Sequence, residues 1–157
     1  EVALDHMFRA DRGATVAANR ATWSNRMNWN TVPWVVFTAP EMAGCGYTEA
    51  EAQSAGIHPV SVTVPLRMSG RYLAEHPREQ GQLTLVADEK TGKVLGVQMI
   101  GTGVSEIIHS AAVLVETQTT VAQLRTVVFP HPTVSEVLRD AAWAITTDGD
   151  KQKENRT

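Results

Sequence analysis

Short apolar segments in the first half of the chain follow the two-residue period of β-strands. Residues 60–64 (VSVTV) alternate apolar and polar positions, as a half-buried strand does. Residues 32–37 form a bulky run rich in β-branched and aromatic side chains, which also predicts a strand. Pro33 restricts this second segment to a strand start or a sheet edge, because proline cannot donate to a ladder.

Two further apolar segments lie close together and predict a hairpin. Residues 82–87 and 94–100 have strand character, and Gly92 in the polar turn between them allows a positive φ. The segment 65–81, which contains Arg, Pro and Gly, is expected to be a long connection.

Helical spacing dominates the second half of the chain. Two sets of apolar positions repeat at three- and four-residue intervals, which predicts helices with one apolar face. They are Val104, Ile107, Ile108, Ala111, Ala112 and Val115, and then Val134, Val137, Leu138, Ala141, Ala142 and Ile145. Thr48 and Thr120 begin capping patterns of two shorter helices, the first ending at Gly56. Consecutive strands followed by helices predict an α+β fold with a mostly antiparallel sheet and helices packed on one side.

The two ends of the chain differ from its middle. Residues 1–30 are polar and rich in Ala and Arg, and we expect a helix followed by a loop. The charged tail 148–157 has no apolar content and is expected to be disordered. The domain itself is expected to span residues 31–147. The first residue is Glu1 rather than Met, which suggests a cut inside something longer.

Composition excludes several classes of function. The 157 residues suffice for one domain, and the net charge of -3, with scattered basic residues, disfavours nucleic-acid binding. The longest aliphatic runs are too short to span a membrane. A single cysteine, Cys45, excludes an internal disulfide and fits a reducing compartment, so we expect a cytoplasmic protein.

Three candidate sites are weak. The turn Gly101-Thr102-Gly103 lies where a dinucleotide fingerprint would lie, but the required third glycine is replaced by Glu106. No His or basic residue stands close to Cys45 in sequence, so this thiol is better explained as a small, partly buried hydrophobe than as a nucleophile. The remaining histidines (His6, His58, His76 and His109) show no metal-binding spacing, and no metal site is expected.

The segment 129–136 (FPHPTVSE) has two possible explanations. Thr133 as a helix N-cap with Glu136 at the third helical position is simply a capping box. The same geometry brings the Glu136 carboxylate back toward the imidazole of His131, where it would fix the tautomer and leave the other ring nitrogen free for proton transfer. The spacing of these residues alone is weak evidence for the His–Glu pair and favours the helix cap.

Three motifs in order resemble the C-terminal dimerisation domain of the FAD-dependent pyridine nucleotide–disulfide oxidoreductases. They are residues 37–41 (FTAPE), 46–49 (GYTE) and 131–136 (HPTVSE), and the segments 92–97, 101–103 and 105–108 also fit. The resemblance covers roughly residues 31–145. It is greatest to dihydrolipoamide dehydrogenase, with mercuric reductase-like and glutathione reductase-like members as alternatives.

The resemblance implies a homodimer in which His131 is the catalytic acid–base for the partner subunit's disulfide and flavin, oriented by Glu136. Pro132 and Thr133 would be structural, with a cis peptide bond before Pro132. FAD and NAD would be the cofactors of the parent enzyme, and a lipoyl-bearing protein its partner. Residues 1–30 would be the remnant of a missing FAD domain.

In that remnant, Leu4, Asp5 and His6 match a segment that lies near the flavin, although Asp5 replaces a small residue. No FAD fingerprint, paired-cysteine motif or NAD-binding half is present, so the fragment is expected to bind neither cofactor and to be inactive by itself. A free-standing dimerisation or binding module and, less favoured, a small hydrolase using His131 are the alternatives.

Overall fold

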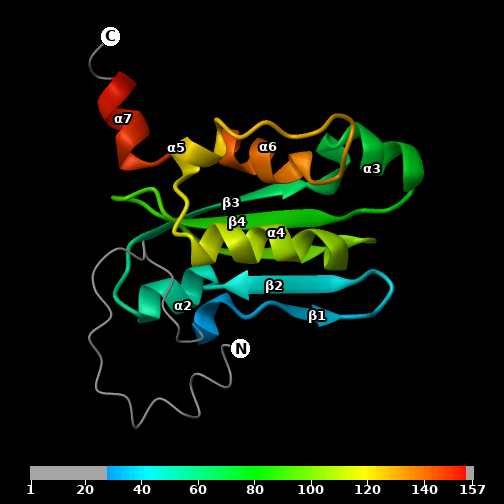
Figure 1. Cartoon of the computed structure of the whole chain (residues 1–157), viewed down its shortest axis with the longest axis horizontal. Helices are drawn as coiled ribbons and strands as arrows, with labels where there is room; N and C mark the ends of the chain where they lie inside the picture. The colour runs from blue at the N-terminus through cyan, green and yellow to red at the C-terminus, as the bar shows by residue number, and fades with distance from the viewer. Residues whose placement is uncertain (1–27, 155–157) are drawn as a thin grey trace, which may run out of the picture.

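Five strands form one antiparallel sheet in the computed structural model, which describes residues 28–154. Their order across the sheet is β1-β2-β5-β4-β3, so the last strand of the sequence lies in the centre (Figure 1). The strands are β1 (Trp34–Val36), β2 (Met42–Gly46), β3 (Pro59–Pro65), β4 (Gln82–Asp88) and β5 (Val94–Ile100). The predicted α+β class with an antiparallel sheet is confirmed, as is the edge position of the strand after Pro33.

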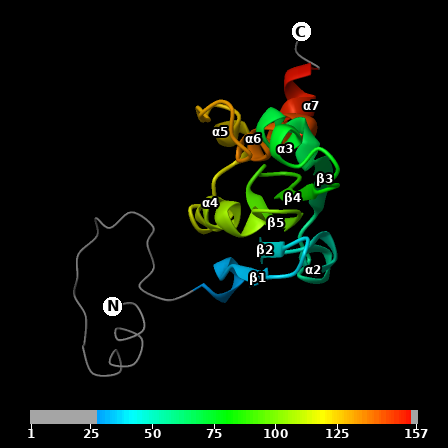
Figure 2. The same ribbon diagram turned by 90° about the vertical axis from the view of Figure 1, so that its right-hand side faces the viewer.

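The helices distribute unequally over the two faces of this sheet. They are α2 (Glu49–Ser54), α3 (Gly70–Glu75), α4 (Val104–Glu116), α5 (Val121–Leu124), α6 (Glu136–Ala144) and α7 (Asp148–Glu154), with 3₁₀ turns η2 (Trp29–Thr31) and η3 (Leu66–Met68). Helix α4 packs on β2 and β5, and α6 packs on β3 and β4. Helix α2 lies on the opposite side of the sheet from α4 (Figure 2), where its Glu49 accepts a hydrogen bond from Ser61 of β3.

Alternation along the strands explains which face holds the core. Leu83, Leu85 and Ala87 of β4 are fully buried toward α4 and α6, with Val97 and Met99 of β5 beside them. Full burial of a leucine, valine or methionine side chain stabilises the fold by about 1.5–3 kcal/mol. The long helices pack on the sheet through the apolar faces that their spacing predicted.

Local signals in the sequence are confirmed at the predicted positions. Thr48 and Glu51 form a complete capping box at the start of α2, and Thr120 and Gln123 form another at α5. Gly92 has a φ of 69° in the turn between β4 and β5.

Strand β2 and the elements of the connection 65–81 were not predicted from the sequence. Strand β2 contains the segment Ala43-Gly44-Cys45-Gly46, in which glycine suppresses the strand signal. Gly44 is required because the indole of Trp34 on the neighbouring strand lies over it. The connection 65–81 is not irregular throughout, since it contains η3 and α3, and the side chain of Ser69 caps α3.

The expected disordered tail is wrong for residues 148–154, which form α7. The charges that suggested disorder have partners: Asp150 pairs with Arg125, and Lys151 pairs with Glu89. The Asp150 carboxylate also accepts hydrogen bonds from the N–H and hydroxyl of Thr147 at the start of the helix.

The predictions for residues 1–27 lie outside the described residues. Among the described residues, no helix is long and apolar enough to cross a membrane.

Candidate functional site

The loop before α6 presents the candidate acid–base group. The His131–Pro132 peptide bond is cis, as the resemblance implied. Helix α6 begins at Glu136 with Ser135 as its N-cap, so the prediction that Thr133 is the N-cap is wrong by two residues. The reason is that the Thr133 hydroxyl donates to the Pro130 carbonyl (2.8 Å) instead of capping the helix. Half of the expected capping box remains, because the Thr133 N–H donates to Glu136 Oε2 (2.9 Å).

His131 and Glu136 form a close pair. Nδ1 of His131 lies 3.0 Å from Oε1 and 3.1 Å from Oε2 of Glu136. The imidazole side chain is 77% exposed while that of Glu136 is 5% exposed, so a solvent-facing ring rests on a buried carboxylate. Since an ionised carboxylate only accepts hydrogen bonds, this contact assigns the hydrogen to Nδ1 and leaves Nε2 free to exchange a proton.

Three groups compensate for the burial of the Glu136 charge. The Thr133 backbone N–H and then the His131 imidazole hold the pKa of Glu136 below its ordinary value, and the guanidinium of Arg139 acts in the same direction. Arg139 Nη2 lies 3.3 Å from Oε1. Glu136 is therefore ionised at neutral pH. Arg139 was not identified from the sequence, although its position three residues along the helix places it beside Glu136.

A second contact that the sequence did not predict reaches this loop from another element. The hydroxyl of Ser69, at the start of α3, donates to the carbonyl oxygen of Thr133 (2.9 Å). The two residues are 64 positions apart, and no local sequence pattern connects them.

The glycine turn Gly101–Gly103 does not fit a nucleotide phosphate. It connects β5, which is antiparallel to both of its neighbours, to α4. The Glu41 carboxylate already accepts from the Ser105 N–H (3.1 Å) in the first turn of α4. A negative side chain at that position repels a phosphate, so this turn does not fit the phosphates of FAD or NAD.

Cys45 has the environment of a core residue. It is 1% exposed in β2, more buried than the sequence suggested. Burial raises the pKa of this thiol to about 11, which disfavours the reactive thiolate. Leu4, Asp5 and His6 lie outside the described residues. Among the described residues, no three His, Cys, Asp or Glu side chains come together in a metal-binding cluster.

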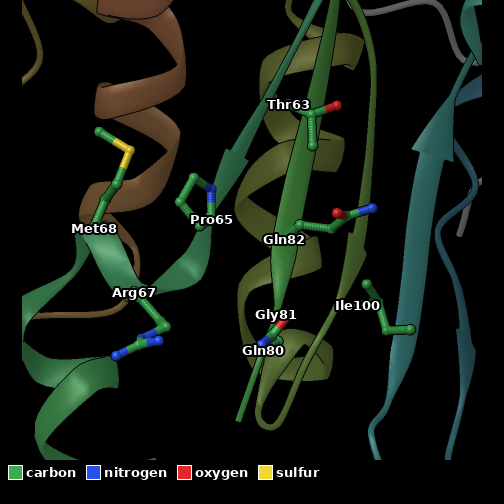
Figure 3. A pocket seen from close by; sticks show the side chains of 8 residues that line it. All are labelled: Thr63, Pro65, Arg67, Met68, Gln80, Gly81, Gln82 and Ile100. Atoms are coloured by element: carbon green, nitrogen blue, oxygen red, sulfur yellow. The ribbon is translucent and has the colours of Figure 1, made fainter. Parts of the chain in front are cut away.

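The structure also has an open hollow of about 830 Å³. Figure 3 shows it on the sheet face opposite α4, with Thr63, Gln82 and Ile100 projecting from three strands. Its rim carries Arg67 and Met68 of η3. None of the site residues above lines this hollow, and the His131 side chain is exposed on its loop.

Comparisons with known proteins extend over most of the chain. A family model for the dimerisation domain of pyridine nucleotide-disulphide oxidoreductases matches residues 32–142. The chain is 35% identical over 135 residues to dihydrolipoyl dehydrogenase of Cupriavidus necator and 40% over 111 residues to that of Haloferax volcanii. It is also 35% identical over 139 residues to mercuric reductase of Shigella flexneri.

These three matches cover 86%, 71% and 88% of the chain, but only 28%, 23% and 24% of the respective relatives. The chain therefore spans less than a third of their length.

Solved structures share the fold. LpdA from Mycobacterium tuberculosis matches with a TM-score of 0.72 at 24% identity, over 90% of this chain and 28% of that one. The HOCl-induced flavoprotein disulfide reductase RclA from Escherichia coli matches with a TM-score of 0.68 at 28% identity, over 73% of this chain and 26% of that one.

Proposed function

Since the chain belongs to the dimerisation-domain family of the pyridine nucleotide-disulphide oxidoreductases, we propose that it completes the active site of a dihydrolipoyl dehydrogenase-like homodimer. The observation that carries this proposal is the exposed His131 imidazole held through Nδ1 by the buried Glu136 carboxylate. In this arrangement the free Nε2 faces outward, toward a group that another part of the enzyme supplies.

His131 is proposed to be the catalytic acid–base and Glu136 its orienting partner. Nε2 takes the proton of a substrate thiol, and the resulting thiolate attacks a disulfide sulfur, releasing the other sulfur as a thiolate. His131 passes this proton to the released thiolate and then takes the proton of the second substrate thiol. The sulfur of that thiol attacks the substrate sulfur of the mixed disulfide and releases the second enzyme sulfur as a thiolate, so the dithiol loses two electrons and two protons and the enzyme disulfide is reduced. The negative Glu136 stabilises the imidazolium formed in the first step.

The remaining components are proposed to lie outside this chain. With one cysteine, the chain cannot form the redox disulfide; we place it in the partner subunit, and propose that the isolated chain is inactive. FAD, held by another domain, would pass the two electrons from the reduced disulfide to NAD. A lipoyl-bearing protein is the proposed dithiol donor. The proposed location is the cytoplasm, which cell fractionation would test.

The decisive experiment is made on the native gene product, isolated from source cells with an antibody against this domain. We expect a flavin-containing polypeptide about three times larger than this chain, with dihydrolipoamide:NAD activity. His131→Gln should lower turnover about 10²–10⁴-fold without changing flavin content. His58→Gln, an exposed histidine far from Glu136 in sequence, is the matched control.

Two results would overturn the proposal. A polypeptide of 17.1 kDa without flavin would make the chain a free-standing dimerising module. Unchanged turnover of the His131 variant would remove this residue from the chemistry. The similarity to mercuric reductase supports a second candidate, which Hg(II)-dependent oxidation of a nicotinamide cofactor by the same preparation would test.

A further inference from the structure

Ser69 is a buried polar residue that links two elements. It is only 2% exposed, and its hydroxyl makes two hydrogen bonds. It accepts from the Tyr72 N–H (3.3 Å), which caps α3, and it donates to the Thr133 carbonyl (2.9 Å) in the loop that carries His131. A serine that served only as a helix cap would need the first of these bonds alone.

The second bond adds a side-chain donor to the Thr133 carbonyl, which also accepts from the Glu136 N–H (3.4 Å). The Thr133 N–H is bound by the Glu136 carboxylate and its carbonyl by Ser69, so both peptide groups of this residue are fixed. The Thr133 hydroxyl bonds within the loop, to the Pro130 carbonyl. Ser69 thus connects this short loop to a different part of the fold.

We propose that Ser69 is a positioning residue for the His131–Glu136 pair, acting through Thr133. The functional importance of Ser69 depends on the proposed catalytic role of His131. The hydroxyl keeps the Thr133 N–H aimed at the carboxylate, and the carboxylate in turn holds the imidazole. Loss of the hydroxyl leaves the Thr133 carbonyl with the longer bond from the Glu136 N–H (3.4 Å), which weakens the hold on the loop and lets it move relative to Glu136.

The charge balance at Glu136 provides an independent way to detect that movement. The groups facing its carboxylate are the His131 imidazole from the loop and Arg139 from α6, with Asp140 pairing to the same guanidinium. The Thr133 N–H is the largest contributor to the lowered pKa of Glu136. If the loop moves, this pKa rises toward the ordinary glutamate value of about 4.3.

The test uses NMR on the 157-residue chain with four variants. Ser69→Ala removes both bonds of the hydroxyl. Ser69→Cys keeps the shape with a weak donor and serves if the alanine variant fails to fold. Ser69→Thr retains the hydroxyl and is the rescue. Thr120→Ala is the matched control, because it removes the cap of another short helix, α5, away from the loop.

The readouts are amide hydrogen exchange of Thr133 and the titration of the Glu136 carboxyl. In Ser69→Ala or Ser69→Cys we expect Thr133 exchange to accelerate about fivefold or more, with a raised Glu136 pKa. Ser69→Thr should restore both values, and Thr120→Ala should change neither.

Unchanged exchange and titration in a folded Ser69→Ala or Ser69→Cys variant would overturn the proposal, and so would equal changes in Thr120→Ala. These readouts require no enzymatic activity. Unchanged turnover of the His131→Gln variant would therefore refute the proposed function. The structural role of Ser69 would still be decided by these NMR measurements.

Discussion

At Glu136, one buried carboxylate serves both the loop and the candidate chemistry. It accepts from Thr133, contacts His131 and pairs with Arg139. Because its pKa is lowered in the folded state, the ionised form stabilises the fold. That stabilisation is fully present above the unfolded value of about 4.3 and is lost as pH falls through the lower folded value.

Glu136→Gln should therefore lower the melting temperature at neutral pH and have a smaller effect in acid. The glutamine side chain can still accept a hydrogen bond from the Thr133 N–H, but the substitution removes the negative charge that pairs with Arg139. Thermal unfolding of both proteins between about pH 2 and pH 7 tests this expectation. Glu75→Gln is the control, since its ion pair with Arg71 is exposed and should contribute little. A constant difference at all pH values would show that the charge of Glu136 does not stabilise the fold.

The spacing of five residues allowed His131 and Glu136 to meet, but the family resemblance rather than this spacing distinguished the pair from a simple helix cap. The cap position was wrong, since the hydroxyl of Thr133 had competing partners within the loop that spacing does not reveal. Ser69 could not have been found, because its contact depends on how η3 and α6 pack. Local chemistry was thus accessible from the sequence, and the contacts between elements were not.

Among the elements, α7 is joined to the end of α6 by the guanidinium of Arg125. Arg125 donates from Nε to the Ala142 carbonyl (2.7 Å) and from Nη2 to the Ile145 carbonyl (2.7 Å), and it pairs with Asp150 of α7. The pair lowers the pKa of Asp150 from 3.8 to about 2. Since the folded value is the lower one, this pairing stabilises the fold above about pH 4 and is lost as pH falls toward 2.

Arg125→Ala should release α7 at neutral pH and lower the free energy of unfolding by about 2 kcal/mol, since hydrogen bonds to a charged group are lost. Amide hydrogen exchange at residues 148–151 measures the release directly. Acidification of the unmodified chain to about pH 2 should reduce the protection of the same amides, measured relative to their intrinsic exchange rate at that pH. Lys151→Ala, which removes exposed ion pairs, should have a much smaller effect. Protected amides in the Arg125 variant would contradict this role.

The elements that the sequence predicted are those with a strong period or a cap. Strands β3, β4 and β5 and helix α4 follow their apolar positions closely, and α2 and α5 begin at their threonine caps. Strand β2 was missed because its small residues make room for a neighbouring indole, which is a tertiary requirement. Helix α7 was missed because its charges are satisfied by distant residues.

Over the whole molecule, large apolar side chains remain exposed on several elements. Val128 is 92% exposed and Phe37 is 80% exposed, and the indole side chains of Trp29 and Trp143 are also largely exposed. Exposed apolar surface on this scale is typical of interaction surfaces, so we expect the chain to self-associate. Sedimentation velocity over a wide concentration range should show a rising sedimentation coefficient. A constant monomeric value at high concentration would contradict this expectation.

Charge substitutions can identify the surface responsible. Val128→Lys and Phe37→Lys each place a positive charge at an exposed apolar position. The substitution that lies in the interface should weaken self-association at least about tenfold. Ser54→Lys is the control, because Ser54 is an exposed residue of α2 and its substitution should leave association unchanged.

The central place of β5 in the sheet bears on how the chain is synthesised. Until Ile100 has left the ribosome, β1–β2 and β3–β4 are separate two-stranded ribbons, because β5 is the strand that joins them. Two-stranded ribbons are marginally stable at best in water. A nascent chain arrested before residue 94 therefore has no continuous sheet. The pair at residues 131 and 136 follows later still, so the scaffold can form before the candidate active site is translated.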